Sequence, residues 1–391
     1  AVLCAPGLEA ALQGTAQPIR RAGQEITMAA QGISFYRIPH PAPVPGATRD
    51  QALADPGFGT VFSDHMVSID WTEGRGWHSH TVGPRQPISL DPATSVLHYA
   101  QEIFEGMKAY RQDDGDLALF RPEANAARFN RSAARLAMPA LPEDQFLAAV
   151  REQVQADRDW FPSVEGGSLY LRPFMFASEA FLGVRPAKEY KFLVIASPVG
   201  GYFKSGAPAV SIWVSEDYSR AAPGGTGDAK CGGNYAASLV PQAEAIAKGY
   251  DQVVFLDAAE RKWIEELGGM NLFFVFDDGR IVTPPLTGTI LPGITRDSLI
   301  TLAREEGLDV VEERYSLAQW RDDAQSGKLV ETMACGTAAV VTPVGKVGGR
   351  DGEFIIGGGS AGQLTAKLRE RLVGIQRGTI EDTHGWVTKI G

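Results

Sequence analysis

The chain has 391 residues with 44% hydrophobic and 21% charged side chains, and its formal net charge at pH 7 is -10. A chain of this length has more residues than a typical domain with one hydrophobic core, so it predicts two domains. The negative charge argues against nucleic acid or an anionic membrane as a partner. No apolar run is long enough to cross a bilayer, and three cysteines without a Cys-x-x-Cys pair suit a reducing cytoplasm.

The N-terminal part of the sequence mixes strand and helix signals. Residues 1–27 precede Met28 and lack the charged head and long apolar stretch of a secretory signal, so we expect a poorly ordered extension. His78 and His80 are expected in a loop, and no histidine has the spacing of a metal ligand. Strands are expected at 61–71, 167–176 and 191–200, a strand with a turn within 94–112, and helices that open with proline and an acid at 122–138 and 142–161.

A change in composition at 200–208, where Gly, Pro and Ser accumulate, predicts a linker between an N-terminal domain of residues 28–199 and a C-terminal domain of residues 209–391. Beyond the linker, strands are expected at 209–219 and 252–258, two or three hairpin strands within 263–284, and helices at 238–250 and 362–378. Residues 291–308 are expected to form the end of a strand, a glycine turn and a helix, and residues 328–344 to contain a second such turn. Strands that come in pairs, without strict alternation with helices, predict an α+β fold rather than a doubly wound sheet.

The segment "GGTGDAKCGGNY" (224–235) places Lys230 between two glycine-rich loops. One interpretation is a nucleotide-binding loop of the form G-x-x-x-x-G-K-[ST], but Ala229 stands where glycine is needed and Cys231 where a hydroxyl should bind magnesium. The other is a lysine that forms a Schiff base with an aldehyde, because the glycines allow a bulky ring to approach and Tyr235 offers a polar contact. A lone lysine is usually a solvated surface residue, so the second interpretation depends on companion groups.

A Schiff-base lysine of this kind would also need an acidic residue that pairs with a pyridine nitrogen and a binding site for phosphate. Glu265 and Glu266 point to opposite faces of the expected strand, so at most one of them can meet the ring. The glycine turns at 291–298 and 335–340 expose backbone N–H groups, and the first opens a helix. Such turns bind phosphate through amide donors and the helix dipole.

Arginines supply the remaining companions. Arg128, Arg131 and Arg135 fall at i, i+3 and i+7 and share one helical face, which is either a solvated basic stripe or the source of one phosphate ligand. In "LYLRP", Tyr170 and Arg172 lie on the same side of a strand, which suits a carboxylate clamp beside an aromatic wall.

Six motifs, in this order, carry a resemblance to a known family: "LHYAQEIFEGMKAY", "LYLRP", "AKCGGNYA", "EELGGMNLFFVF", "TPPLTGTILPGITRDSL" and "CGTAAVVTPV". Together they resemble the branched-chain amino acid aminotransferases of pyridoxal-phosphate fold type IV, over residues 58–378. The resemblance implies a smaller N-terminal α/β domain, a larger C-terminal domain with a β-barrel-like core, and pyridoxal 5′-phosphate at their interface. It further implies reversible amino-group transfer from Leu, Ile or Val to 2-oxoglutarate by a cytoplasmic homodimer, in which the partner's loop near 178–185 helps to close the pocket.

The resemblance also implies roles for individual residues. Lys230 would hold the cofactor as a Schiff base and act as the general acid and base, and Glu266, not Glu265, would pair with the pyridine nitrogen. The other cofactor-binding residues would be Arg128, Tyr235, Leu291, Ile294, Thr295 and Thr337. The substrate-binding residues would be Phe62, Tyr99, Phe104, Tyr170, Arg172, Thr337 and Ala338.

Three positions depart from some members of this family. Ala339 and Thr342 stand where animal members carry a redox Cys-x-x-Cys, so thiol regulation is not expected there, and Gly269 stands where some members carry Thr. A D-amino acid aminotransferase or an aminodeoxychorismate lyase of the same fold type is the alternative enzymatic interpretation, and a non-catalytic protein that binds pyridoxal phosphate is a third. The combined motifs favour the branched-chain enzyme over both.

Overall fold

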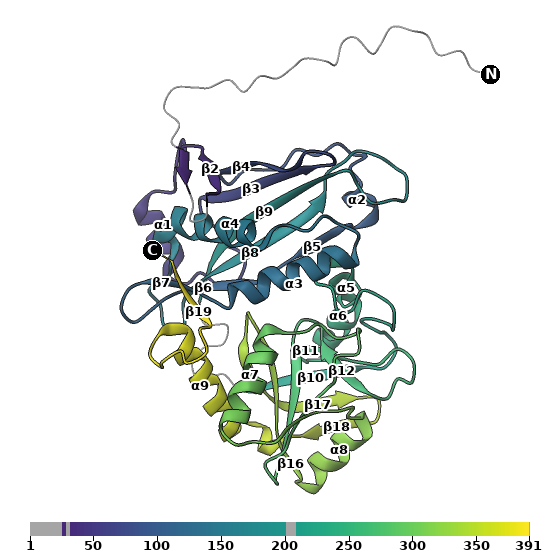
Figure 1. Cartoon of the computed structure of the whole chain (residues 1–391). Coiled ribbons are helices and arrows are strands. Elements are labelled where there is room, and N and C mark those ends of the chain that lie inside the picture. The colour runs from purple at the N-terminus through teal and green to yellow at the C-terminus, as the bar shows by residue number, and fades with distance from the viewer. Residues whose placement is uncertain (1–25, 29–31, 201–208, 391) are drawn as a thin grey trace, which may run out of the picture.

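Two β-sheets organise the protein, one above the other in the view of Figure 1. The computed structural model describes residues 26–28, 32–200 and 209–390. The predicted linker 200–208 therefore lies outside the described residues apart from Gly200, and so does the predicted extension 1–27 apart from Ile26 and Thr27, which form a strand with Met28. The domain boundary stays a prediction.

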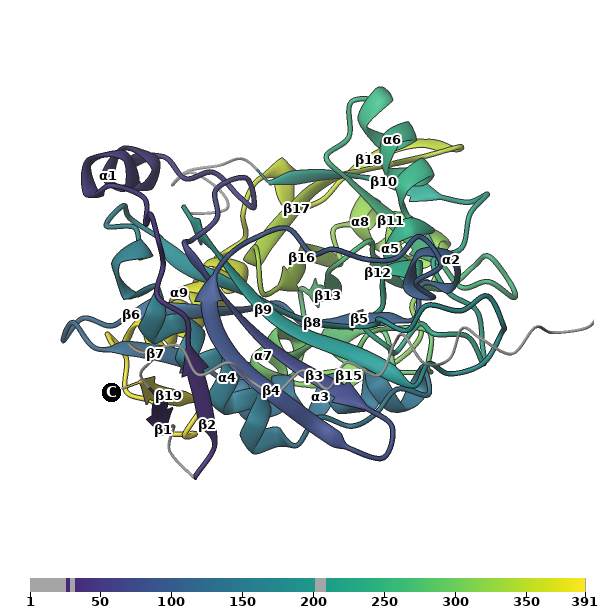
Figure 2. The same cartoon turned by 90° about the horizontal axis from the view of Figure 1, so that it is seen from above.

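The first sheet, at the top of Figure 1, has ten strands within the described residues and is antiparallel except where β2 pairs with β4. In spatial order it consists of β1 (Ile26–Met28), β2 (Ser34–Arg37), β4 (Gly76–Pro84), β3 (His65–Thr72), β9 (Glu189–Val199), β8 (Ser168–Ala177), β6 (Met107–Arg111), β7 (Leu117–Phe120) and β19 (Val387–Ile390), with β5 (Glu102–Phe104) paired to β8. Figure 2 shows its long strands side by side from above. The helices of this half are α1 (Gly46–Ala54), α2 (Val96–Tyr99), α3 (Pro122–Arg135) and α4 (Glu143–Ala156), with a 3-10 turn at Arg158–Trp160.

The second sheet has nine strands within the described residues and is mixed, with parallel pairs between β10 and β11, β10 and β17, and β14 and β15. In spatial order it consists of β12 (Ile264–Leu267), β11 (Gln252–Leu256), β10 (Val210–Ser215), β17 (Val340–Gly349), β16 (Leu329–Gly336), β13 (Asn271–Phe276), β14 (Ile281–Thr283) and β15 (Val310–Glu312), with β18 (Gly352–Ile355) paired to β17. The helices of this half are α5 (Gly232–Ala236), α6 (Leu239–Ala247), α7 (Ile294–Glu305), α8 (Leu317–Ser326) and α9 (Gln363–Arg377), with a 3-10 turn at Gly357–Gly359.

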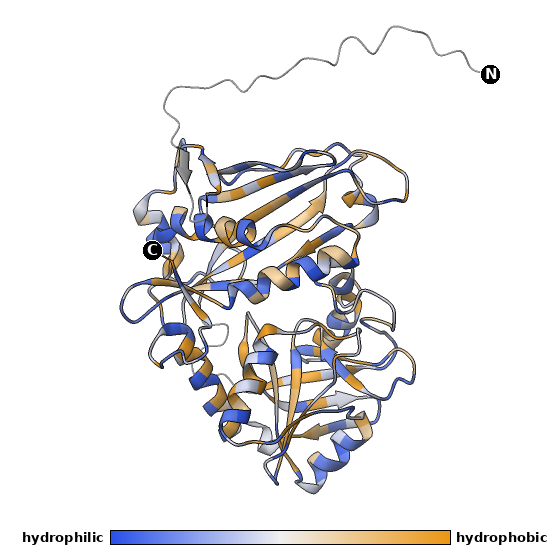
Figure 3. Cartoon of the chain, in the orientation of Figure 1, coloured by the Kyte–Doolittle hydropathy of each residue, from blue (hydrophilic) through white to orange (hydrophobic). Residues whose placement is uncertain are grey.

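Each sheet has its own apolar core, and in Figure 3 the hydrophobic colour concentrates on the strands. Phe129 and Phe146 on α3 and α4 meet Phe192 of β9 with ring centroids 5.4–5.9 Å apart, which fixes both helices on the first sheet. Trp320 of α8 packs on Phe274 of β13 in the second core. Both helices of the first core also carry exposed polar residues, as amphipathic helices do, but Asn125 and Arg128 of α3 are polar and buried.

The paired strands confirm the predicted α+β fold. His78 and His80, which were expected in a loop, lie on β4, where their rings contact Thr72 and Gln145, so this expectation is wrong. Polar side chains on the solvated side of an antiparallel strand weaken the apolar alternation from which a strand is recognised. None of the described helices combines the length and the apolar composition needed to span a bilayer.

Candidate functional site

A cavity of about 170 Å³ lies where the two halves of the molecule meet. Its wall combines β5, α3 and β8 of the first half with α5, β12, the start of α7 and the end of β16 in the second half. The predicted site residues in this wall are Phe104, Arg128, Tyr170, Arg172, Lys230, Tyr235, Glu266, Leu291, Ile294, Thr295, Thr337 and Ala338. The fold therefore gathers twelve predicted residues, named from separate motifs, around one space.

Lys230 lies in the loop that precedes α5 and is half-buried. Its backbone is held by the first half from both sides, because its N–H donates to Ser132 Oγ (2.9 Å) and its carbonyl accepts from the N–H of Phe104 (2.9 Å). Its Nζ donates to Tyr235 Oη at 2.5 Å and lies 4.7 Å from the centre of the Phe104 ring. The amine is thus fixed between a hydroxyl group and an aromatic face in the cavity.

A close backbone contact requires glycine at position 227 of the lysine loop. A Cβ on Gly227 would clash with the backbone of Thr289, including its carbonyl oxygen, which cannot move aside as the end of a side chain can. Glycine at this position therefore lets the lysine loop pass close to the backbone of Thr289. On the other side of Lys230, the Gly232 N–H donates to the Glu102 carboxylate.

Of the two adjacent acids, Glu266 lines the cavity and Glu265 does not. Glu265 accepts a hydrogen bond from Thr289 Oγ1 (2.5 Å), whereas Glu266 Oε1 accepts from the Leu291 N–H (2.9 Å). Burial raises the pKa of Glu266 to about 7, although the neighbouring Arg220 opposes this rise. The alternation of the strand therefore selects Glu266 as the acid that a ligand can meet.

Arg220 is a residue of the site that the sequence analysis missed. Its Nη1 lies 2.8 Å from Glu266 Oε1, with both side chains buried, and also donates to the Thr289 carbonyl at 3.1 Å. A buried carboxylate keeps its charge only when a cation or hydrogen bonds compensate its lost hydration. Arg220 supplies that cation from outside the cavity wall. Because Arg220 contacts Oε1 of Glu266, the other carboxylate oxygen, Oε2, remains available to a ligand.

Arg128 supplies a positive charge in the wall of the cavity. Its Nε and Nη2 donate to the two oxygens of Glu105, each at 2.8 Å, and its Nη1 donates to the Pro292 carbonyl at 3.2 Å. Arg131 is exposed, and Arg135 donates to two carbonyls of the glycine loop. Of the three arginines on this helical face, Arg128 is therefore the one that reaches the cavity.

Two backbone segments form the part of the cavity wall near Arg128. Helix α7 begins after Gly293 without a side-chain cap, and its first residues, Ile294 and Thr295, line the cavity. The first N–H groups of a helix have no partner within the helix and bind anions well. Thr337 and Ala338, in the turn between β16 and β17, lie in the same wall.

An aromatic wall with one arginine forms the remaining side. Arg172 Nη2 donates to Tyr170 Oη at 3.3 Å, and its guanidinium lies 4.8 Å from the centre of the Phe104 ring. The Nε of Arg172 is buried without a hydrogen-bond partner among the described residues. Phe58, a wall residue that the sequence analysis missed, packs edge-on against Tyr170 with ring centroids 5.2 Å apart.

Two predicted substrate-binding residues lie outside this wall. Phe62 is 36% exposed beneath the guanidinium of Arg85, and Tyr99 is 42% exposed and donates to the Leu182 carbonyl at 2.5 Å. Their roles stay predictions. Cys335 does line the cavity, but burial raises the pKa of its thiol to about 12, which keeps it protonated and unreactive.

The donor set fits the group that the sequence predicts, pyridoxal 5′-phosphate. Lys230 offers an amine for an aldehyde, Glu266 offers a carboxylate for a ring nitrogen, and Arg128 with the start of α7 offers a phosphate site. The orphaned Nε of Arg172 is a donor of the kind that binds a carboxylate. The described residues contain no group of three or more His, Cys, Asp or Glu side chains placed to hold a metal ion.

Comparison with known proteins gives a consistent result. The family model for amino-transferase class IV matches residues 102–347. The probable branched-chain-amino-acid aminotransferase of Streptomyces coelicolor is 59% identical over 89% of this chain and 96% of its own length. The branched-chain-amino-acid aminotransferase of Mycobacterium tuberculosis H37Rv is 54% identical over 93% of this chain and all of its own.

Solved structures agree with these sequence matches. The branched-chain amino acid aminotransferase of Escherichia coli superposes with a TM-score of 0.69 at 30% identity, covering 83% of this chain and 100% of that one. The T.th. branched-chain amino acid aminotransferase with pyridoxamine 5′-phosphate gives 0.69 at 30% identity, and its complex with N-(5′-phosphopyridoxyl)-L-glutamate gives 0.67 at 29%; both cover 83% of this chain and 99% of their own.

Proposed function

Because this chain belongs to the amino-transferase class IV family, we propose that the cavity around Lys230 is its active site. The chain is a branched-chain-amino-acid aminotransferase of fold type IV, and its cofactor is pyridoxal 5′-phosphate. One observation supports the location most strongly: the amine of Lys230, the carboxylate of Glu266 and the guanidinium of Arg128 line one cavity between the two halves.

When bound, the cofactor supplies an aldehyde that receives the amino group and a ring that withdraws electrons from the substrate Cα. We propose that Arg128 and the first N–H groups of α7 bind the phosphate, and that Glu266 Oε2 holds a proton on the ring nitrogen. The buried pair with Arg220, at 2.8 Å, supports an ionised Glu266 in this role. A fixed carboxylate in a site of low dielectric stabilises positive charge more than the same group in water.

Lys230 has two tasks in this proposal. Its Nζ would hold the cofactor, and once the incoming substrate amine had released it, the free amine would serve as the base that takes the proton from the substrate Cα and as the acid that gives it back. The hydrogen bond to Tyr235 Oη and the ring of Phe104 hold Nζ in one place, which supports proton transfer along a fixed path. The bulk of Phe104 and Tyr235 on the amine also limits the access of water.

The aromatic wall is proposed to bind the substrate side chain. Phe58, Phe104 and Tyr170 offer apolar surface, and a pocket of this kind discriminates by only roughly 1–3 kcal/mol per methylene group, so one enzyme accepts leucine, isoleucine and valine. Arg172, with its orphaned Nε, is proposed to bind the second carboxylate when glutamate or 2-oxoglutarate enters.

We also propose that the protein is a cytoplasmic homodimer. The buried free thiols Cys231 and Cys335 suit a reducing compartment. Exposed apolar side chains gather on α2, on α6 and in the loop after β8, and a second copy of the chain would cover them. These side chains are Leu97, Leu182, Val184, Leu239, Val240 and Ile246.

The test of the active site is Lys230→Ala. We expect the purified variant to lack the visible absorbance of the lysine-bound cofactor and to lose conversion of leucine in a single half-reaction. Lys248→Ala is the matched control, because Lys248 also lies over an aromatic ring, that of Trp213, but outside the cavity. A Lys230→Ala protein that still turns over leucine and 2-oxoglutarate at the normal rate would exclude Lys230 from catalysis.

A further inference from the structure

Lys108 is a buried amine that the reaction described above does not use. It lies on β6 of the first sheet, is 7% exposed, and its Nζ donates to the carbonyl oxygen of Ala338 at 2.8 Å. Ala338 belongs to the turn between β16 and β17, in the second half of the molecule. One hydrogen bond from Lys108 thus crosses from the first sheet to a turn that lines the active site.

The surroundings of Lys108 offer its charge no partner. Its side chain borders a small cavity of about 20 Å³, whose walls contain no Asp or Glu within the part of the chain that is described. Burial, together with the charges of Arg377 and Arg369, lowers the pKa of Lys108 to about 7. A buried amine without a carboxylate is costly to fold, so its position calls for a compensating role.

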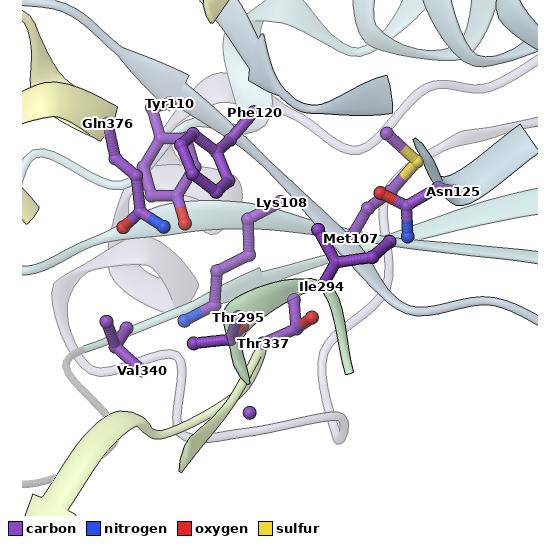
Figure 4. Close-up of a pocket in the computed structure, with 11 residues that line it drawn as sticks. Met107, Lys108, Tyr110, Phe120, Asn125, Ile294, Thr295, Thr337, Val340 and Gln376 are labelled. Atoms are coloured by element: carbon purple, nitrogen blue, oxygen red, sulfur yellow. The ribbon is translucent and has the colours of Figure 1, made fainter. Parts of the chain in front are cut away.

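The small cavity adjoins the active site. Ile294, Thr295, Gly336 and Thr337 line both cavities, so they form the partition between Lys108 and the space next to Lys230. Figure 4 shows Lys108 reaching toward Thr295 and Thr337. Movement of the 336–340 segment would therefore change the wall of the active site directly.

The turn itself is strained. Gly336 and Val340 are paired across a three-residue connection, and Val340 has a φ of 62°. A β-branched residue with positive φ is a genuine outlier, since glycine is the residue that normally fills such a position in a hairpin. Strain of this kind persists only when the surrounding structure holds it in place.

We propose that Lys108 is a positioning residue, whose amine holds the Ala338 carbonyl so that the strained 336–340 turn keeps the backbone N–H groups of Thr337 and Ala338 directed at the substrate carboxylate. The proposal rests on the proposed function, in which the substrate amino acid enters this cavity, and on the substrate-binding role that the family resemblance implies for Thr337 and Ala338. A lysine amine donates a hydrogen bond whether it is neutral or protonated, so the contact survives titration of Lys108. Other groups facing Lys108 from the packed elements are Tyr110, Asn125 and Gln376, none of which carries a charge at neutral pH.

Lys108→Met removes the donor and keeps the length of the side chain. In the holoenzyme we expect the KM for leucine to rise about tenfold with kcat changed less, the loss that one hydrogen bond explains. We also expect amide hydrogen exchange at 336–340 to accelerate by about tenfold, a readout that does not depend on turnover. Lys346→Met, on β17 but paired with Glu353 at the surface, is the control and should alter neither quantity.

A rescue experiment separates positioning from general stability. In the Lys108→Met background, Val340→Gly relieves the strained φ, so it should restore part of the exchange protection and of the KM. Unchanged exchange at 336–340 in Lys108→Met, or faster exchange with an unchanged KM, would overturn the proposal. A wild-type protein without transaminase activity would instead overturn the proposed function, and the exchange arm would still report on the turn.

Discussion

The buried pair of Arg128 and Glu105 allows a sharp test of how the phosphate end of the site is held. Arg128 is 4% exposed and Glu105 is fully buried, and two parallel hydrogen bonds of 2.8 Å join them. Asn125 Nδ2 also donates to Glu105 at 2.8 Å. Glu105→Gln keeps the size of the side chain and removes its charge, which leaves the guanidinium in the interior without a counter-charge.

The expected cost follows from burial. Removing one partner of a buried ion pair costs about 3–5 kcal/mol, whereas an exposed pair contributes about 0–1 kcal/mol. We therefore expect the free energy of unfolding of cofactor-free Glu105→Gln to fall by about 3 kcal/mol or more at pH 7. The control is Glu313→Gln, which breaks the exposed 2.9 Å pair with Arg280 and should cost no more than about 1 kcal/mol.

The pH dependence of Glu105 supplies an internal check. Burial alone would raise the pKa of Glu105, but Arg128 outweighs this effect and holds the pKa below its ordinary value. A carboxyl group with a lowered pKa stabilises the folded state above its unfolded pKa and loses that contribution as the pH falls through the folded value. In urea unfolding, the wild type and Glu105→Gln should thus differ fully above about pH 5 and converge in stronger acid. Equal losses in Glu105→Gln and Glu313→Gln at pH 7 would refute the reasoning.

Two further predictions concern the ring end of the site and the assembly. Burial raises the pKa of Glu266 from 4.5 to about 7, so in the cofactor-free protein the contribution of Glu266 to stability should be full below pH 4.5 and fall by about 3 kcal/mol as the pH rises to 7. Glu266→Gln should remove that part of the pH dependence in urea unfolding. An unchanged profile would contradict the buried state of Glu266. Light scattering should give twice the mass of one chain, and Leu239→Glu on the exposed face of α6 should shift the protein toward the mass of a monomer; a wild-type monomer would contradict the proposed dimer.

The sequence allowed the wall of the site to be predicted better than the residues behind it. Lys230 and Arg128 stand in motifs with glycine turns or helical spacing, and strand alternation separates Glu265 from Glu266. Arg220 and Glu105 carry no such signal, because each is a single charged residue whose partner is distant in the chain, and charged residues of this kind are usually solvated. Their pairing depends on how segments distant in the sequence pack together within each half, which local patterns do not encode.

Irregular segments are the second kind of feature that could not be predicted from the sequence. Phe58, and not the predicted Phe62, lies in the cavity wall, and both stand in a loop without a period that would indicate which ring turns inward. The strand β4 carries His78 and His80, and its polar residues conceal the alternation. For the fold as a whole, long apolar or amphipathic segments such as α4 and β9 were predictable, because burial of one face imposes the period.

The two buried ion pairs beside the cavity have opposite orientations. Arg128 faces the cavity and Glu105 neutralises it from behind, whereas Glu266 faces the cavity and Arg220 neutralises it from behind. Glu105 and Arg128 are thus buried as a charged pair before any ligand arrives, whereas Glu266, whose pKa burial raises to about 7, is only partly ionised beside Arg220 near neutral pH. The cavity is nevertheless polarised, positive where a phosphate would bind and negative where a ring nitrogen would carry a proton. Because these charges are fixed by the fold, binding requires little reorganisation, and this polarity selects the orientation of the cofactor relative to Lys230.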